Sequence, residues 1–201
     1  MPLPPACPSR QPKHRRSIDV QVFARDDGLW EVDATLIDTK TRDVPLGGGV
    51  RRAGEPIHDM LLRLVVDRAL NVVAAGSHTQ GMPYAGECDR HDDAYARLVG
   101  LNLGRGFRRA LLERVGGVRG CTHLTELAQV LPTAVIQAFA GDVIDTRADR
   151  PGDPRPFQID RCHALRESGD VVRVHFPRWY RQPDAKNDAD NAPSMPATTP
   201  A

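Results

Sequence analysis

Cysteine, histidine and aspartate side chains that could hold a metal ion occur at three separated places in this chain. They precede one run of alternating apolar residues, follow another, and open a long amphipathic segment: His58, Asp59, Cys88, Cys121 and His123. Rigid scaffolds position side chains well at the ends of strands and helices, where several can converge on one ion. Thiolate, imidazole and carboxylate ligands together suit zinc, and a set that contains sulfur also suits iron. We therefore expect a zinc or iron site with these five residues as candidate ligands.

The spacing of these residues leaves alternatives open. Cys121 and His123 would point about 200° apart on a helix, so both can bind one ion only if Cys121 precedes the helix. The competing interpretation is that Cys88 and Cys121 are buried thiols and that the histidines are ordinary core or surface residues. Four protein ligands predict a structural or carrier site, whereas a water ligand predicts a Lewis-acid enzyme with Asp59 or His123 as general base.

Two other classes of function fit the same sequence. In the first, the positive end of a helix favours a thiolate at Cys121, and His123 assists it in a metal-free thiol enzyme or carrier. In the second, the chain is a protein-interaction module in which cysteine and histidine are structural. Cys162 and His163 could join either site, but a packed thiol beside a surface imidazole is favoured. Phosphate-loop, serine-hydrolase and zinc-protease motifs of the common kinds are absent, which disfavours those three reactions. Whether the protein is an enzyme of another kind stays open.

Composition limits the partners and the compartment. Lys+Arg 27 against Asp+Glu 26 gives a net charge of +1, which predicts neither a nucleic-acid surface nor a membrane surface. Prolines interrupt the first residues before a secretory apolar region can form, and no stretch is apolar enough to cross a bilayer. Four scattered cysteines do not make a disulfide framework. We expect a cytoplasmic protein whose partner is another protein or a small molecule.

Hydrophobic periodicity predicts an α+β fold. Apolar residues alternate with polar ones over four stretches, at 18–22, 30–36, 60–66 and 72–77. Helical spacing follows at 95–99, 107–115 and 124–139, and Pro132 lies within the last of these stretches. Consecutive strands joined by short turns favour an antiparallel β-meander, with the three helices packed on one face of the sheet.

The ends of the chain differ in composition from its body. Residues 1–16 form a proline-rich basic leader, and residues 182–201 are rich in Ala, Asn, Asp, Thr and Pro. Neither end can bury enough apolar surface to offset the entropy of ordering, so both are expected to be disordered. A single domain is expected over 17–181. Its last alternating segment, 171–176, predicts an edge strand or a short docking arm.

Several segments of the body are similar to DUF2889, an uncharacterised bacterial domain family. The similar segments are Arg25–Trp30 with Asp38, Pro56–Met60, Pro83–Cys88, Gly100–Leu101, Gly120–Leu124, Gln137 and Cys162–Leu165. This resemblance covers nearly all of the body. It implies an intact member of that family, and it brings no established activity, cofactor or partner.

A more distant resemblance concerns residues 54–140. Gly54–Leu64 is similar to the Cys-Gly-Asp segment and following strand of NifU-type iron–sulfur cluster scaffold proteins. This resemblance implies a NifU/SufE-like fold and matches Asp59, Cys88 and Cys121 to three of the scaffold ligands. The first scaffold cysteine is replaced here by Ile57 or His58. A site that lacks this thiol favours a single metal ion over cluster assembly.

Overall fold

The computed structural model describes residues 3–148 and 150–183, with the side chains of residues 91 and 92 excepted. The chain forms two compact units, Met1–Phe139 and Ala140–Ala201. The strands of the first unit are β1 (His14–Ala24), β2 (Trp30–Lys40), β3 (Val44–Leu46), β4 (Gly49–Arg51), β5 (Pro56–Val66) and β6 (Val72–Gly81). Its helices are η1 (Asp89–Leu98), α1 (Phe107–Val115), η2 (Gly117–Arg119) and α2 (Thr122–Phe139). The second unit contains η3 (His163–Leu165), α3 (Asp170–His175) and η4 (Pro177–Trp179), and all four η elements are 3₁₀ helices.

Four long strands form the antiparallel sheet that the alternation predicts. Their order is β1-β2-β5-β6, and β3 pairs with β4 in a separate small hairpin. The turn between β1 and β2 uses Asp27, which accepts a hydrogen bond from the backbone N–H of Leu29, and Gly28, whose φ is 81°. Glycine adopts this left-handed conformation without steric cost, so the predicted hairpin closes here.

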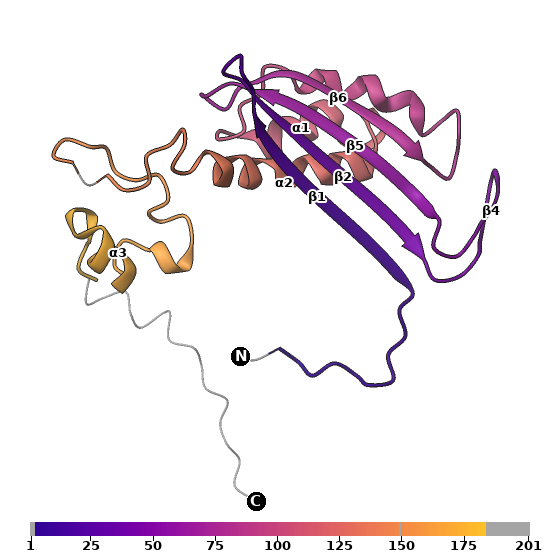
Figure 1. The fold of residues 1–201 in the computed structure, drawn as a ribbon, viewed down its shortest axis with the longest axis horizontal. Coiled ribbons are helices and arrows are strands. Elements are labelled where there is room, and N and C mark those ends of the chain that lie inside the picture. The colour runs from indigo at the N-terminus through magenta and orange to yellow at the C-terminus, as the bar shows by residue number, and fades with distance from the viewer. Residues whose placement is uncertain (1–2, 149, 184–201) are drawn as a thin grey trace, which may run out of the picture. The chain divides into compact units, whose positions relative to one another are not determined.

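A layer of helices covers one face of the sheet (Figure 1). Helix α2 contacts β1, β2 and β5, η1 contacts β6, and α1 packs against α2 and η1. The α+β class with an antiparallel sheet is therefore confirmed. The number of helices differs from the prediction, because the described residues form four helices of six residues or more, with α3 in the second unit.

The core lies between this helical layer and the sheet. Every second side chain of β2, from Val32 to Leu36, is fully buried, as are the side chains of β5 from Leu62 to Leu64 that face the same side. Helix α2 buries residues at helical spacing: Leu124, Leu127, Ala128, Leu131, Val135 and Phe139. The helix continues through Pro132. Among the described residues, no helix combines the length and the apolar character that crossing a bilayer requires.

The structure differs from three expectations drawn from the sequence. Strand β1 begins at His14, so the last residues of the predicted disordered leader belong to the sheet. The segment predicted as an edge strand or docking arm forms α3, because Asp170 in its first turn and His175 in its last turn complement a helix dipole. Cys162 is exposed at the start of η3, so the expected packing of its thiol is wrong. The predicted disordered tail lies outside the described residues from 184 onward.

Candidate metal centre

A buried carboxylate on β2 organises one end of the sheet. The side chain of Asp38 is 3% exposed and lies in register between Arg16 on β1 and His58 on β5. Arg16 donates from Nε to Oδ1 at 2.9 Å and from Nη2 to Oδ2 at 2.8 Å, and it also donates from Nη1 to Glu126 on α2 at 2.6 Å. His14 Nε2 lies 3.2 Å from Oδ1. One guanidinium thus ties two strands to the helix above them.

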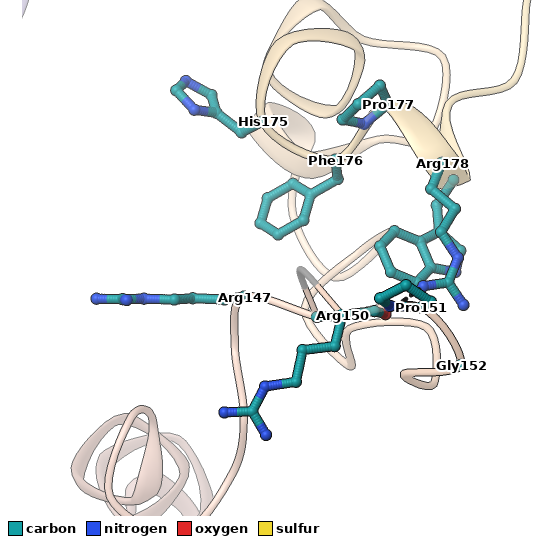
Figure 2. Close-up of a pocket in the computed structure, with 10 residues that line it drawn as sticks. Arg147, Arg150, Pro151, Gly152, His175, Phe176, Pro177 and Arg178 are labelled. Carbon is teal, nitrogen blue, oxygen red and sulfur yellow. Dashed lines mark hydrogen bonds between the residues drawn. The ribbon is translucent and has the colours of Figure 1, made fainter.

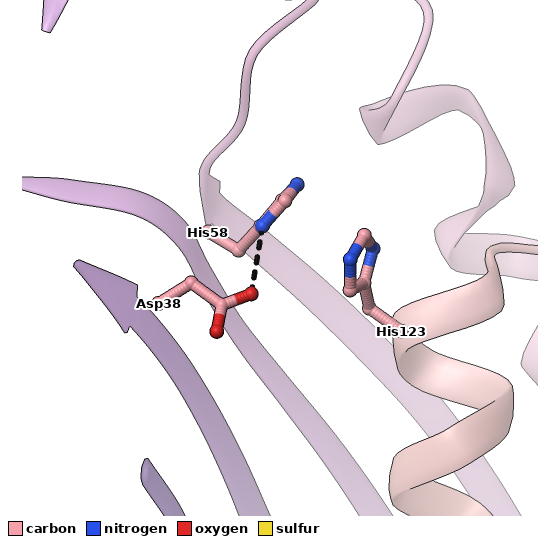
Figure 3. Close-up of side chains that lie close together, drawn as sticks. All are labelled: Asp38, His58 and His123. Carbon is pink, nitrogen blue, oxygen red and sulfur yellow. Dashed lines mark hydrogen bonds and ion pairs between the residues drawn. The ribbon is translucent and has the colours of Figure 1, made fainter. Parts of the chain in front are cut away.

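Two histidines meet beside this carboxylate (Figure 3). His58 Nδ1 lies 3.0 Å from Asp38 Oδ2. The ring of His58 packs on the ring of His123, which comes from the first turn of α2, with the ring centroids 3.9 Å apart. One potential ligand atom from each of Asp38, His58 and His123 lies within 4.8 Å of the others. Elements that are far apart in the sequence therefore bring imidazole and carboxylate groups to one point.

A buried tyrosine fixes the start of α2. Tyr95 Oη accepts a hydrogen bond from the backbone N–H of Cys121 at 3.0 Å and donates to the carbonyl of Cys121 at 2.8 Å. Its hydroxyl also lies 3.0 Å from Thr125 Oγ1. At Gly120 a Cβ atom would lie 2.6 Å from the carbonyl oxygen of Val115, so the chain has no room for a side chain here. These contacts hold Cys121 just before the helix, the only placement in which it and His123 can share an ion.

Of the two predicted thiols, Cys121 contacts this group, whereas Cys88 shares only a pocket with Cys121. Cys121 Sγ is 3.8 Å from His123 Nδ1. In a tetrahedral zinc site, sulfur and nitrogen ligands at their usual bond lengths are separated by about 3.5 Å, so little movement would let both bind one ion. Cys88, which precedes η1, lines a pocket of about 360 Å³ together with Cys121, Tyr84 and Glu87.

The electrostatics of the group favour an ionised aspartate and a neutral His123. Burial alone would raise the pKa of Asp38, but hydrogen bonds from Arg16 and His58 outweigh burial and lower its pKa to about 2. The hydrogen bond to Asp38 is the main reason that the pKa of Arg16 is raised. Burial lowers the pKa of His123, and the nearby His58 and Arg16 lower it further. A neutral imidazole keeps a lone pair that can bind a metal or accept a proton.

The hydrogen bonds of Asp38 suit an orienting role better than direct ligation. Both of its oxygens already contact donors, Oδ1 from Arg16 and His14, and Oδ2 from Arg16 and His58. A histidine that donates its Nδ1 proton to a carboxylate is held in the tautomer whose Nε2 lone pair is free, an arrangement common behind metal ligands. The ligand atoms that remain are Nε2 of His58, a ring nitrogen of His123 and the thiol of Cys121.

Of the five residues that the sequence singles out, Asp59 lies apart from this group. It pairs with Ile37 across the sheet and lies on β5 between His58 and Met60. Since successive side chains of a strand point to opposite faces, Asp59 faces away from the helices. In contrast, sequence reasoning missed Asp38 as a site residue and assigned Arg16 to the disordered leader.

The first unit is thus an antiparallel sheet covered by helices, with a histidine, cysteine and aspartate cluster where strand ends meet the start of α2. The model of the family described as "Protein of unknown function (DUF2889)" matches residues 14–137. The chain belongs to this family. The match begins at the first residue of β1 and ends two residues before the end of α2, so it covers the unit that contains the cluster. Comparisons with curated proteins and with solved structures gave no match.

Proposed function

We propose that this protein is a metal-binding module whose ion is zinc or iron, held by His58, His123 and Cys121. The observation that carries the proposal is the meeting of two histidines beside the buried carboxylate of Asp38, with the ring centroids of His58 and His123 3.9 Å apart. Asp38 orients His58 through the hydrogen bond to Nδ1. The thiol of Cys121 supplies the sulfur ligand from the adjoining start of α2.

Cys121 also lines a pocket with Cys88, so we assign the fourth coordination position to that side of the ion. Cys88 as a fourth ligand closes the coordination and makes the site structural or a carrier. A water molecule in that position makes the ion a Lewis acid. His123 is then occupied as a ligand, so the candidate general base is Glu87, which lines the same pocket. The proposed site contains thiols, and the four cysteines of the chain are free. We therefore infer a reducing compartment such as the cytoplasm.

The test is metal content of protein purified without a metal-binding tag from cells supplied with zinc and iron. We expect about one ion per chain in the natural protein, and loss of that ion in H58A and C121S. Replacement of the ion by cobalt(II) adds a spectroscopic readout, because thiolate ligation gives charge-transfer bands that C121S lacks. The same spectra of C88S show whether Cys88 fills the fourth position.

Matched controls come from the chain itself. His78 is exposed, and its side chain lies on the face of the sheet away from the helices. We therefore expect H78A to keep its metal. Cys162 is exposed in the second unit, so C162S is the control for C121S. Folded natural protein that contains no metal and shows no cobalt spectrum would refute the proposal.

A metal-free thiol function is the second candidate, and the contact between Cys121 Sγ and His123 Nδ1 favours it. A thiol at the start of a helix and beside an imidazole is activated as a nucleophile. In chelated protein, iodoacetamide should then label Cys121 faster than the more exposed Cys162, and H123N should remove this advantage. Labelling of Cys121 at or below the rate of Cys162 would argue against nucleophilic function.

Assembly of an iron–sulfur cluster in the NifU manner is a narrower proposal for the same site. It requires sulfide to enter beside the thiols of Cys88 and Cys121. Incubation with iron and sulfide under anaerobic conditions separates it from the mononuclear site. Bound iron with stoichiometric sulfide supports a scaffold, whereas bound iron without sulfide supports the single ion.

A further inference from the structure

A second potential site lies entirely within the second unit, independent of the metal centre. Residues between α2 and η4 surround a pocket of about 670 Å³, within the range usual for small-molecule sites. Its described lining contains three arginines, a histidine and two aromatic rings, and no acidic residue: Arg147, Arg150, Arg178, His175, Phe176 and Trp179. Such a lining favours an anion that also carries a flat apolar surface.

Two of the arginines have guanidinium groups available to a ligand. Neither Arg147 nor Arg150 forms an ion pair with any described residue. The neighbouring carboxylates bind the backbone instead: Asp145 accepts from the N–H of Arg147 at 2.9 Å, and Asp153 accepts from the N–H of Arg150 at 2.8 Å. These bonds shape the turns. The charge of Asp145 interacts with both guanidinium groups but forms no ion pair with them, so among the described residues both can turn to a phosphate, for which the guanidinium fork is well suited.

Arg178 has a different role, because its hydrogen bonds are internal. It donates to the carbonyls of Arg150 and Asp153, both at 2.8 Å, and its guanidinium lies 4.6 Å from the centre of the Trp179 ring. Arg178 therefore joins η4 to the loop that carries Arg150. This bracing holds the wall of the pocket in place before a ligand binds.

The remaining aromatic ring, that of Phe176, lines the same pocket as the two arginines. Figure 2 shows the side chains of His175 and Phe176 extending to the same side as those of Arg147 and Arg150. Phe176 is partly exposed, so one face of its ring can stack against a planar group. The positions of the charges and the ring match a compound with phosphate at one end and a heteroaromatic ring at the other.

We propose that this pocket binds a nucleoside phosphate, with the base against Phe176 and the phosphate between Arg147 and Arg150. Calorimetric titration of the full chain with AMP tests the proposal. We expect saturable binding that weakens as salt is added, because the charges are exposed to solvent. The double variant R147A/R150A should weaken binding by about 10- to 100-fold, the loss usual for hydrogen bonds to charged groups.

The matched control is R161A/R173A, which removes the same charge from the same unit. Arg173 pairs with Asp170 and Arg161 contacts the carbonyl of Phe157, and neither lines the pocket. AMP binding that is absent, or that falls equally in both double variants, would overturn the proposal. Ribose 5-phosphate should bind more weakly than AMP, and F176L should reduce that difference. Equal binding of AMP, ribose 5-phosphate and inorganic phosphate would overturn recognition of the base.

Discussion

Replacing Asp38 by asparagine keeps the size of the side chain and removes the charge on which three basic side chains converge. The pKa of Asp38 falls from its ordinary value of 3.8 to about 2 in the folded chain. Burial opposes this change, and the hydrogen bonds of Arg16 and His58 produce it. A shift of nearly two units corresponds to about 2 kcal/mol of stability from the ionised form. We therefore expect D38N to lower the free energy of unfolding by about 2 kcal/mol at neutral pH.

The pH dependence gives this prediction its sign. A carboxyl group whose pKa is lowered by folding stabilises the fold above its ordinary pKa, and the stabilisation is lost as the pH falls toward the folded value. The stability gap between the natural protein and D38N should therefore be constant at neutral pH and narrow between about pH 4 and pH 2. Urea unfolding of metal-free protein, followed by circular dichroism at several pH values, measures this gap.

Asp33 provides the control on the same strand. It accepts two hydrogen bonds from Arg63, both at 2.6 Å, on the opposite face of the sheet, where the Arg63 side chain is 49% exposed. Exposed pairs contribute at most about 1 kcal/mol, so D33N should cost less than D38N. Equal losses in the two variants, or a gap for D38N that does not narrow in acid, would refute the argument from burial.

Further predictions concern the start of α2. Y95F should lower the free energy of unfolding by about 1–3 kcal/mol, because the N–H of Cys121 loses its acceptor. Thermal unfolding measures this loss, and an unchanged midpoint would contradict the prediction. G120A should destabilise by about 1–3 kcal/mol, since its Cβ would lie 2.6 Å from the carbonyl of Val115, and G48A, where nothing lies near, is the control. In metal-free protein, lowering the pH below the ordinary pKa of histidine should destabilise the natural chain relative to H123N. Folding lowers the pKa of His123, so below the ordinary histidine pKa the unfolded chain binds a proton that the folded chain does not. Urea unfolding at several pH values measures this effect, and an equal pH dependence of stability in the two proteins would contradict the lowered pKa.

The sheet and the long helices could be predicted from the sequence because burial imposes their periods. Strand β2 buries every second side chain from Val32 to Asp38, β5 does so from Met60 to Leu64, and α2 buries residues three and four apart. The hairpin of β3 and β4 has no comparable periodic signal, because each strand has only three residues around a glycine-rich turn. Residues 171–176 alternate like a strand, yet the described part of the second unit offers no strand to pair with them.

The sequence of β2 contains a signal for the burial of the central aspartate. Asp38 follows Val32, Ala34 and Leu36 at the same two-residue spacing, so the pattern of β2 alone places its carboxylate on the buried face. A buried carboxylate needs a basic partner. Arg16 lies on β1 at the position that pairs with Asp38. A basic run beside prolines resembles a solvated leader, which concealed this pairing. The contact between His58 and His123 depends on how α2 crosses the sheet, and no local pattern encodes that crossing.

The network around Asp38 also determines what loss of metal in a variant would mean. Arg16, Asp38 and Glu126 link β1, β2 and α2 through hydrogen bonds that involve no ligand atom of the proposed site. A core of fully buried residues from the sheet and α2 lies beneath them, so we expect the chain to fold without an ion, unlike small zinc domains. C121S takes away a ligand and leaves this frame intact, whereas H58A removes a ligand together with the hydrogen bond of His58 to Asp38. Metal lost from C121S therefore reports coordination, whereas H58A and D38N change the ligands and the frame together.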